Sequence, residues 1–481
     1  MSKISQTFKK FPRVFWVANT IELFERWAWY GFFMLFANYL TSSVDMGGLE
    51  LSQVQKGLIM GVGTGILYFL PVITGSIADR FGYKRVLVVA FIIYTTAFIA
   101  MPMFKSFAGV FFIYLYLALG AALFKPVISA TIAKSTTSET ASIGFGIFYM
   151  MVNLGAFFGP MVTLLFKNSA SSLIFYISAG IISLNFILLL FYKEPERKQT
   201  TETIGQSISK VFVNIIEVLR DVKFVIFLLI VAGFWTMYNQ LFFTLPVFIM
   251  QWVDTSSLYD FFHQYLPFFS EHYGTKTGQM QAEFITNFDA LYIIIFQVII
   301  SSIVMKWRAL QSMMAGFLVC AIGMALTLTT QNVMFTLVAI YIFAIGEMAG
   351  SPKITEYIGR IAPPDKKALY MGYSFIPVFL GNVFAGFISG NVYQAMSDKT
   401  IFIKQEVAAQ NINIEAGLSQ NEYFEQAASS MKMTASELTN HLWEKYNPSS
   451  IWIVILIIGL AAVVSLFFYD ANLRKQEKQK A

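Results

Sequence analysis

The chain has a single cysteine and few charges. Cys320 lies in an apolar run, so no disulfide can form within the chain, and we expect its thiol to be buried in packing. Only 13% of the 481 residues are charged, whereas 56% are hydrophobic and the mean hydropathy is +0.61. A soluble domain carries roughly 25% charged residues. The composition therefore predicts an integral membrane protein.

The signatures of common enzyme and metal sites are also absent from the sequence. It contains no Gly-x4-Gly-Lys-Ser/Thr, Gly-x-Ser-x-Gly or His-Glu-x-x-His, and its three histidines lie in predicted loops without metal-ligand spacing. Gly61, Gly63 and Gly65 lie inside an apolar run, where they indicate close helix packing and not a nucleotide-binding turn. We expect a protein that is not an enzyme and holds no metal or cofactor.

The hydrophobic residues fall in runs that are long enough to cross a bilayer. A helix needs about 20 apolar residues to span the hydrocarbon core. Twelve such runs lie near 13–41, 54–79, 84–105, 107–134, 141–167, 170–193, 223–252, 285–307, 309–330, 332–361, 367–395 and 449–470. The predicted fold class is an all-α polytopic membrane protein with these twelve transmembrane helices.

Basic residues indicate the orientation. The lysines and arginines between the runs gather on one side of the predicted membrane, which the positive-inside rule assigns to the cytoplasm. This explains the net charge of +6 without nucleic acid as a partner. An even helix number places both termini in the cytoplasm, and we expect the first run to be a span and not a removable signal. The lack of any Asn-x-Ser/Thr sequon agrees with a bacterial inner membrane.

The twelve runs divide into two sets of six. Residues 1–193 and 223–481 are expected to form two six-helix bundles, joined by the polar cytoplasmic linker 194–222, as in transporters built around a central site. The linker has apolar residues at helical spacing, which predicts a short amphipathic surface helix. These residues are Ile208, Val211, Phe212, Ile215 and Leu219.

Two long polar loops are expected outside the membrane, at 253–284 and 396–448. Thr434 and Glu437 have the spacing of a capping box that opens a surface helix in the second loop. These loops are candidates for binding a partner protein.

Three charges interrupt the first apolar run. Glu22, Glu25 and Arg26 are spaced by three and four residues, so they project toward one side of a helix, about 12 Å or more from its start. Ionisable groups at this depth line bundle interiors and mark ion or substrate paths. An internal salt bridge that only fixes packing is the alternative, but two acids share one base. The surplus carboxylate is a candidate proton carrier.

Further charges lie in other runs. Lys125 is central in the fourth run, Glu347 lies in the tenth and Asp289 lies near the outer end of the eighth. A cation and an anion from opposite halves suit a zwitterionic substrate, although each charge could instead serve packing. Lys353 and Glu356 form either a gating salt bridge or a snorkelling surface pair.

Several segments resemble known transporter motifs. ITGSIADRFGYKR, with Asp79 and Arg80, is similar to the loop signature between helices 2 and 3 of the major facilitator superfamily. ELFERWAWYG, from Glu22 to Gly31, resembles the ExxERFxYYG motif of the proton-coupled oligopeptide transporters. Weaker resemblances to that family run along both halves, at Gly120 to Ser129, Phe148 to Gly155, Glu347 to Pro352 and Gly381 to Gly386.

The resemblance implies a role for each candidate residue. Proton coupling would rest on Glu22, Glu25 and Arg26, and gating on Asp79, Arg80, Lys353 and Glu356. Arg26 and Lys125 would bind the substrate carboxylate, and Glu347 its amino group. The substrate-binding residues are expected to be Arg26, Trp29, Tyr30, Lys125, Tyr149, Asn153, Asn239, Asp289, Glu347 and Ser351.

The sequence also departs from the family pattern. Trp27 and Trp29 replace Phe and Tyr in the first motif, and Asn239 stands where many members carry a glutamate. Ser374 stands where a tryptophan is common, and Asp289 stands in for an asparagine. These changes leave carboxylate recognition intact but bear on peptide specificity and proton stoichiometry.

Three functions follow as hypotheses. The leading one is a monomeric, proton-coupled symporter that imports di- and tripeptides or similar small zwitterions by alternating access. The second is a transporter of the same fold for a different small metabolite or anion. The third is a non-transporting membrane receptor or scaffold that works through the long outer loops.

Overall fold

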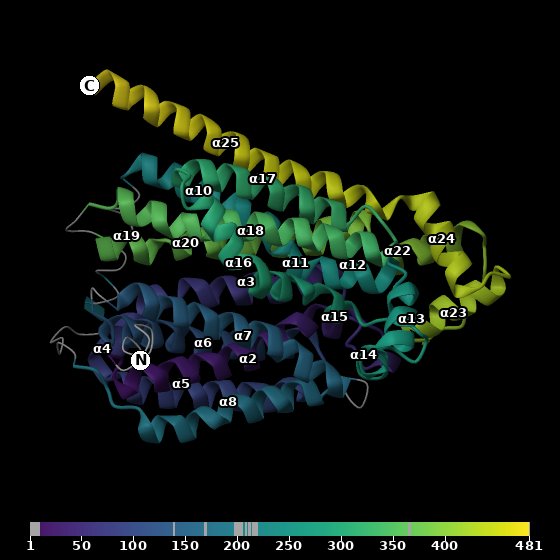
Figure 1. The fold of residues 1–481 in the computed structure, drawn as a ribbon. Helices are drawn as coiled ribbons and strands as arrows, with labels where there is room; N and C mark the ends of the chain where they lie inside the picture. Colours follow the sequence, from purple (N-terminus) through teal and green to yellow (C-terminus); the bar gives the residue numbers. More distant parts are fainter. Residues whose placement is uncertain are drawn as a thin grey trace. The chain divides into compact units, whose positions relative to one another are not determined.

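The computed structural model describes residues 10–137, 140–167, 171–196, 220–363 and 367–480, together with 205, 206, 209 and 213. Within these residues the only regular secondary structure is helical, apart from two isolated bridges (Figure 1). The predicted amphipathic helix of the linker lies outside the described residues.

Twelve described segments match the predicted spans. Ten are long and apolar enough to cross a membrane, and the pair α3 (Gln53–Phe69) and α4 (Pro71–Phe81), bent by 45° where Pro71 begins a new helix, forms an eleventh. The twelfth is α2 (Arg13–Thr41), which has 29 residues but is made less apolar by Arg13 at its start and by the three charges in its middle. The polytopic all-α fold class is confirmed.

Contacts divide the chain into two compact units. Unit 1 consists of Met1–Phe33, Gly63–Val225 and Pro364–Phe379, and unit 2 of Met34–Val62, Ile226–Pro363 and Leu380–Ala481. The predicted bundle limits at 193 and 223 remain a prediction.

Unit 1 is built around α5. This helix packs against α6 and α8, while α4 packs against α6. The complete helices of this unit are α4, α5 (Tyr83–Ala100), η2 (Met101–Met103), α6 (Phe107–Lys134), α7 (Ala141–Lys167), α8 (Leu173–Phe191) and α19 (Lys367–Tyr373).

Unit 2 is built around the pair α17 and α18, which lie side by side (Figure 1). Glycines allow this approach: a Cβ on Gly346 of α18 would lie 2.2 Å from the backbone nitrogen of Cys320 on α17, and one on Gly316 would lie 2.5 Å from that of Gly350. Cys320 is buried as expected.

The membrane helices of unit 2 comprise long helices and several short pieces. The long helices are α16 (Phe288–Val304), α17 (Ala309–Thr327), α18 (Val333–Ile361) and α25 (Ile451–Lys480). The short pieces are α11 (Gln240–Phe243), α12 (Leu245–Trp252), α15 (Ala282–Thr286), η3 (Ile388–Val392) and α21 (Tyr393–Met396). Four helices have residues in both units: α2, α3, α10 (Val222–Tyr238) and α20 (Phe375–Phe387).

Besides the bent pair α3 and α4, two further predicted continuous runs are broken helices. The run at 223–252 comprises α10, α11 and α12, with breaks at Asn239 and Thr244, and Pro246 lies in the first turn of α12. The run at 367–395 breaks at Ser374 and passes through the π-helical η3. Hydropathy reports only that these segments are apolar, so the breaks were not predicted.

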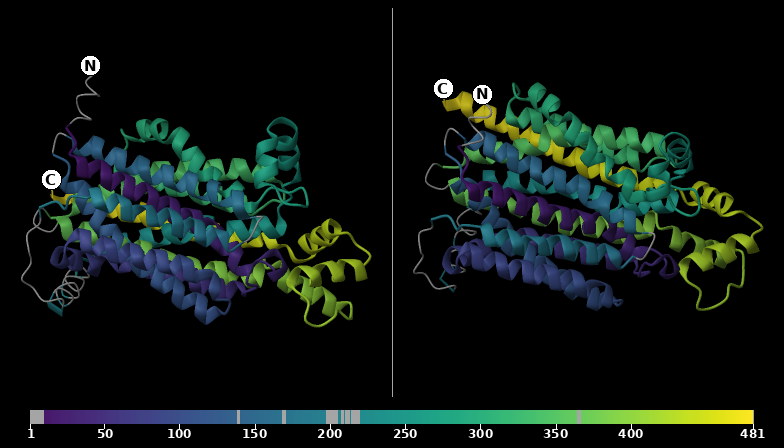
Figure 2. Two further views of the ribbon diagram at one scale, coloured as in Figure 1. Left: turned by 90° about the horizontal axis from the view of Figure 1, so that it is seen from below. Right: turned by 60° about the horizontal axis from the view of Figure 1, so that its bottom comes forward.

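The long loops are folded into surface helices. The first holds α13 (Ser256–Tyr265) and α14 (Pro267–Tyr273), and the second holds α22 (Lys399–Ala409), α23 (Gln420–Ser430) and α24 (Ala435–Tyr446). Helices α22 to α24 extend beyond the ends of the long helices of unit 2 (Figure 2). The 3-10 turns of unit 2 are η1 (Val44–Met46) and η4 (Pro448–Ser450).

A buried acid holds the second long loop together. The predicted capping box of Thr434 and Glu437 is confirmed at the start of α24. Glu406 on α22 accepts hydrogen bonds from Lys445 at 2.7 Å and Tyr446 at 3.0 Å on α24. The bond to Glu406 raises the pKa of Lys445 above its ordinary value.

The α17 and α18 contact predicts the effect of one added methyl group. Gly346→Ala places its Cβ against the Cys320 backbone, and overpacking of this kind costs about 1–3 kcal/mol. We expect a melting temperature several degrees lower in detergent. Gly180→Ala, at a helical position with no atom within 4 Å of the added Cβ, is the matched control and should melt at the wild-type temperature or above. Equal melting of both variants would contradict this packing.

Candidate functional site

The charges of α2 form a buried cluster in unit 1. Arg26 lies between the two acids: its Nε is 3.2 Å from Glu22 Oε1, and its Nη2 is 2.5 Å from Glu25 Oε2. The three residues are 0–6% exposed. An uncompensated charge at this depth costs several kcal/mol, so Arg26 needs at least one of the two carboxylates as a counter-charge. Glu22 also interacts electrostatically with Lys125 on α6.

A neighbouring helix completes the cluster. Tyr94 on α5 donates a hydrogen bond from its hydroxyl to Glu25 Oε1. Glu25 is thus held by both Arg26 and Tyr94, whereas among the described residues the ion pair of Glu22 is the longer one to Arg26. The two acids are therefore not equivalent, and Glu22 is the one more easily released.

Glycines of α7 bring Arg26 into place. A Cβ on Gly155 would lie 2.6 Å from the Arg26 Cβ, and a Cβ on Gly159 would lie 2.5 Å from the carbonyl oxygen of Trp27. On the other side, a Cβ on Gly31 would lie 2.6 Å from Thr163 Oγ1. The approach of α2 and α7 thus requires small residues on both helices.

A second cation lies on α6 in the same unit. Lys125 is half-buried, and its Nζ lies 4.2 Å above the centroid of the Tyr68 ring. No described carboxylate lies within ion-pair distance of this ammonium group, in contrast to Arg26. A cation–π contact leaves hydrogen-bonding capacity unused. Lys125 is therefore available to an anionic ligand.

The other predicted residues of unit 1 differ in exposure. Trp29 is buried among aromatic rings, with its centroid 5.4 Å from Phe33 and 6.5 Å from Tyr114. Tyr30 lies beside Arg26, whose Cζ is 5.9 Å from the ring centroid. On α7, Tyr149 is exposed, and Asn153 donates to the Tyr149 carbonyl at 2.9 Å.

Unit 2 carries the acidic part of the predicted site. Glu347 on α18 accepts a hydrogen bond at 2.9 Å from the hydroxyl of Tyr238 on α10. Asp289, in the first turn of α16, is 5% exposed. Asp289 Oδ1 and Glu347 Oε2 are both buried without a hydrogen-bond partner among the described residues. A buried acceptor without a hydrogen-bond donor lowers the stability of the folded protein, because its lost hydration is not replaced.

At the break in the seventh run, 223–252, a side-chain amide nitrogen has no hydrogen-bond partner among the described residues. Asn239 lies at the junction of α10 and α11, is 7% exposed, and its Nδ2 has no hydrogen-bond partner in the described part of the chain. Ser351 is half-buried on α18, one turn beyond Glu347. These positions remain predicted substrate contacts.

The predicted gating residues form local interactions. On α18, Lys353 Nζ lies 2.7 Å from Glu356 Oε2, and Arg360 Nη2 lies 2.6 Å from Glu356 Oε1. Glu356 thus forms ion pairs with both basic residues. In unit 1, Asp79 accepts a hydrogen bond at 3.0 Å from Tyr83 across Gly82, whose φ of +101° suits glycine. Arg80 lies over the Phe81 ring, with its Cζ 5.7 Å from the ring centroid.

Sequence reasoning missed several participants. Tyr68, Tyr94 and Tyr238 lie in other helices than the charges that they contact, so no spacing pattern identifies them. Lys56, near the start of α3 in unit 2, was also missed, although a lysine within a predicted span was a visible signal. It is fully buried, and its Nζ donates to the Phe243 carbonyl at 2.9 Å.

Comparisons with known proteins identify the family of the chain. The model of the Major Facilitator Superfamily matches residues 19–386. The uncharacterized MFS-type transporter YqjV of Bacillus subtilis is 24% identical over 371 residues, 74% of this chain and 83% of that protein. A di-/tripeptide transporter of Lactococcus lactis is 26% identical over 167 residues, so the match spans only 34% of each protein.

A solved structure shows the same fold over nearly the whole chain. The crystal structure of the peptide transporter POT in complex with sulfate aligns with a TM-score of 0.69 at 17% identity, covering 96% of this chain and 95% of that one. The chain therefore belongs to the major facilitator superfamily, as a polytopic membrane transporter with the fold of the POT peptide transporters.

Proposed function

We propose that this protein is a proton-coupled symporter that imports di- and tripeptides or similar small zwitterions by alternating access. The observation that carries the proposal is a pair of complementary, unsatisfied groups. In unit 1, the ammonium of Lys125 has no ion pair within 4.0 Å among the described residues; in unit 2, Asp289 Oδ1 and Glu347 Oε2 have no hydrogen-bond partner among them. A peptide has one carboxylate and one amino group, which match these two requirements.

The acids of α2 are proposed to carry the proton. With both carboxylates charged, Arg26 is held by two ion pairs. Protonation of Glu22 removes the weaker of the two ion pairs of Arg26 and frees guanidinium donors for the substrate carboxylate. Substrate binding and protonation then favour one another, which is the linkage that a symporter needs.

The driving force is adequate for accumulation. One proton moving down a potential of about 100 mV contributes about 2.3 kcal/mol, and each pH unit contributes about 1.36 kcal/mol. Together they support an accumulation of about several hundredfold.

A second candidate is a transporter of another small metabolite. Asn239 and Ser374 replace side chains that are common in peptide transporters, and Trp29 packs against Phe33 and Tyr114. Charge recognition by Lys125 and Glu347 would serve a modified amino acid equally well. Thermal shifts over a panel of peptides and small amino acids separate the two: a shift by dialanine alone supports peptides, and a shift by an amino acid alone favours this candidate.

We further propose that the protein acts as a monomer in a bacterial inner membrane, with both termini in the cytoplasm.

The function is tested by Glu22→Gln. We expect the wild-type protein in proteoliposomes to accumulate labelled dialanine above equilibrium under an inside-negative, inside-alkaline gradient. The variant should lose accumulation at least tenfold but retain exchange of internal for external dialanine, because exchange needs no net proton release. An uncoupler should abolish wild-type accumulation. Absence of both uptake and exchange in folded wild-type protein would exclude dialanine as a substrate.

Lys125→Gln tests carboxylate recognition. Loss of a charge-assisted hydrogen bond costs about 1.5–3 kcal/mol, so we expect KM for dialanine to rise about 10- to 100-fold. Lys125→Arg keeps the charge and should be less impaired. Equal effects of the two substitutions would show that the charge is not the recognised feature.

Gly155→Ala tests the placement of Arg26. The added methyl group collides with the Arg26 side chain, and we expect uptake to fall about tenfold or more from a displacement of this size. Gly146→Ala lies on the same helix, has no atom within 4 Å of the added Cβ, and serves as the control. Normal uptake by Gly155→Ala would show that the exact position of Arg26 is unimportant.

A further inference from the structure

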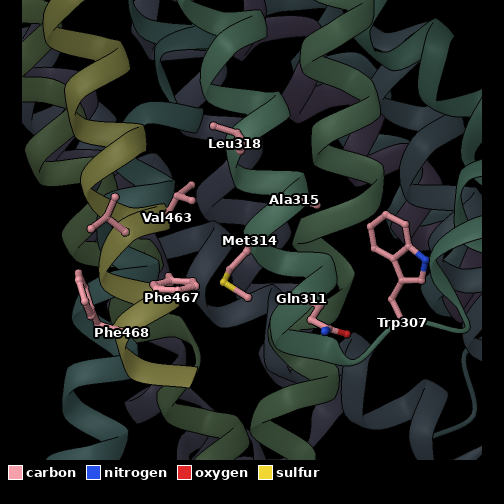
Figure 3. A pocket seen from close by; sticks show the side chains of 9 residues that line it. Trp307, Gln311, Met314, Ala315, Leu318, Val463, Phe467 and Phe468 are labelled. Carbon is pink, nitrogen blue, oxygen red and sulfur yellow. The ribbon is translucent and has the colours of Figure 1, made fainter. Parts of the chain in front are cut away.

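Helix α25 has an apolar groove on each side. One groove, of about 690 Å³, lies between α17 and α25, and the other, of about 700 Å³, lies between α10 and α25. Phe468 lines both. Met314 and Phe467 point toward one another in the first groove (Figure 3). Both volumes lie within the range of about 300–1,000 Å³ that is typical of ligand sites.

Polar groups lie at one end of the first groove. Trp307 and Gln311 line it there, whereas Leu318 lies at its other end (Figure 3). This end contains the start of α17, which the charge distribution assigns to the cytoplasmic side. Tryptophan with one polar edge is typical of the level of lipid head groups. The groove thus has an apolar length followed by an interfacial end.

The same end is strongly basic. The buried Asp470 on α25 forms ion pairs with two arginines: its Oδ1 lies 3.2 Å from Arg308 Nη2, and its Oδ2 lies 2.5 Å from Arg474 Nη2. These three side chains together carry one net positive charge. Arg474 Nε is buried without a hydrogen-bond partner among the described residues. Residues 306–308, just before α17, and 470–479, near the end of α25, carry five basic residues against two acids; they are Lys306, Arg308, Arg474, Lys475 and Lys478, against Asp470 and Glu477.

Helical spacing aligns these charges with the grooves. Phe467 and Arg474 are seven residues apart on α25, and so are Phe468 and Lys475, so each basic residue lies on the face of a groove-lining ring. A molecule with two apolar chains astride Phe468 would place an anionic head group at Arg474 and Lys475. A second copy of this chain would bring the same basic set to a symmetric contact, where like charges repel.

We propose that the two grooves around α25 bind one anionic phospholipid, with its acyl chains on either side of Phe468 and its phosphate at the basic end of α25. This site is separate from the proposed substrate residues. Basic pockets between transmembrane helices are a recognised form of anionic-lipid site.

Native mass spectrometry of the whole protein in detergent tests the proposal. The probes are palmitoyl-oleoyl phosphatidylglycerol and the phosphatidylcholine with the same chains. We expect tighter binding of phosphatidylglycerol. Each basic side chain contributes about a fivefold gain in affinity for an anionic surface, so Lys306→Gln combined with Lys475→Gln should weaken that binding about 20- to 30-fold. Neither lysine is in an ion pair of the described residues.

Two further variants keep the result interpretable. Lys276→Gln combined with Lys432→Gln removes two exposed loop charges and should change binding by less than twofold. Ala315→Trp fills the first groove and should reduce binding of both lipids. Equal affinity for the two lipids, or equal loss in both lysine pairs, would overturn the proposal. A dimer in the wild-type spectrum that Ala315→Trp converts to monomer would also overturn it, because the groove would then be a contact between copies.

Discussion

The burial of Arg26 between two carboxylates is the interaction on which the proposed function depends. An arginine in an apolar bundle needs compensation, but a single carboxylate would compensate it fully and leave nothing to titrate. Here Glu22 and Glu25 both contact the guanidinium, and Tyr94 holds Glu25 from another helix. In the proposed mechanism, this inequality makes Glu22 the carboxylate that takes up and releases the proton.

The close contact of α2 with α7 supports this arrangement. Glycine at 155 and 159 lets the two backbones approach, and Arg26 lies where any larger residue at position 155 would displace it. A comparable device in unit 2 brings α17 and α18 together through Gly316 and Gly346, beside the segment that carries Glu347. Small residues thus position the charged side chains in each unit.

The sequence predicts much of the fold and part of the site. Long apolar runs reveal the spans because a bilayer imposes a minimum length, and the spacing of Glu22, Glu25 and Arg26 places them on one side of a helix. The breaks at Asn239 and Ser374 were not predictable, because hydropathy does not distinguish a continuous helix from a broken one. The partners Tyr68, Tyr94 and Tyr238 come from other helices, and tyrosine in a membrane span has many roles.

The most direct test of proton-coupled zwitterion transport is the internal pH of proteoliposomes that enclose a pH-sensitive dye. Addition of dialanine outside, under an inside-negative potential, should acidify the lumen with wild-type protein, and Glu22→Gln should abolish this signal. Entry of labelled dialanine without acidification would contradict the account, since the charges around Arg26 would then have no part in coupling.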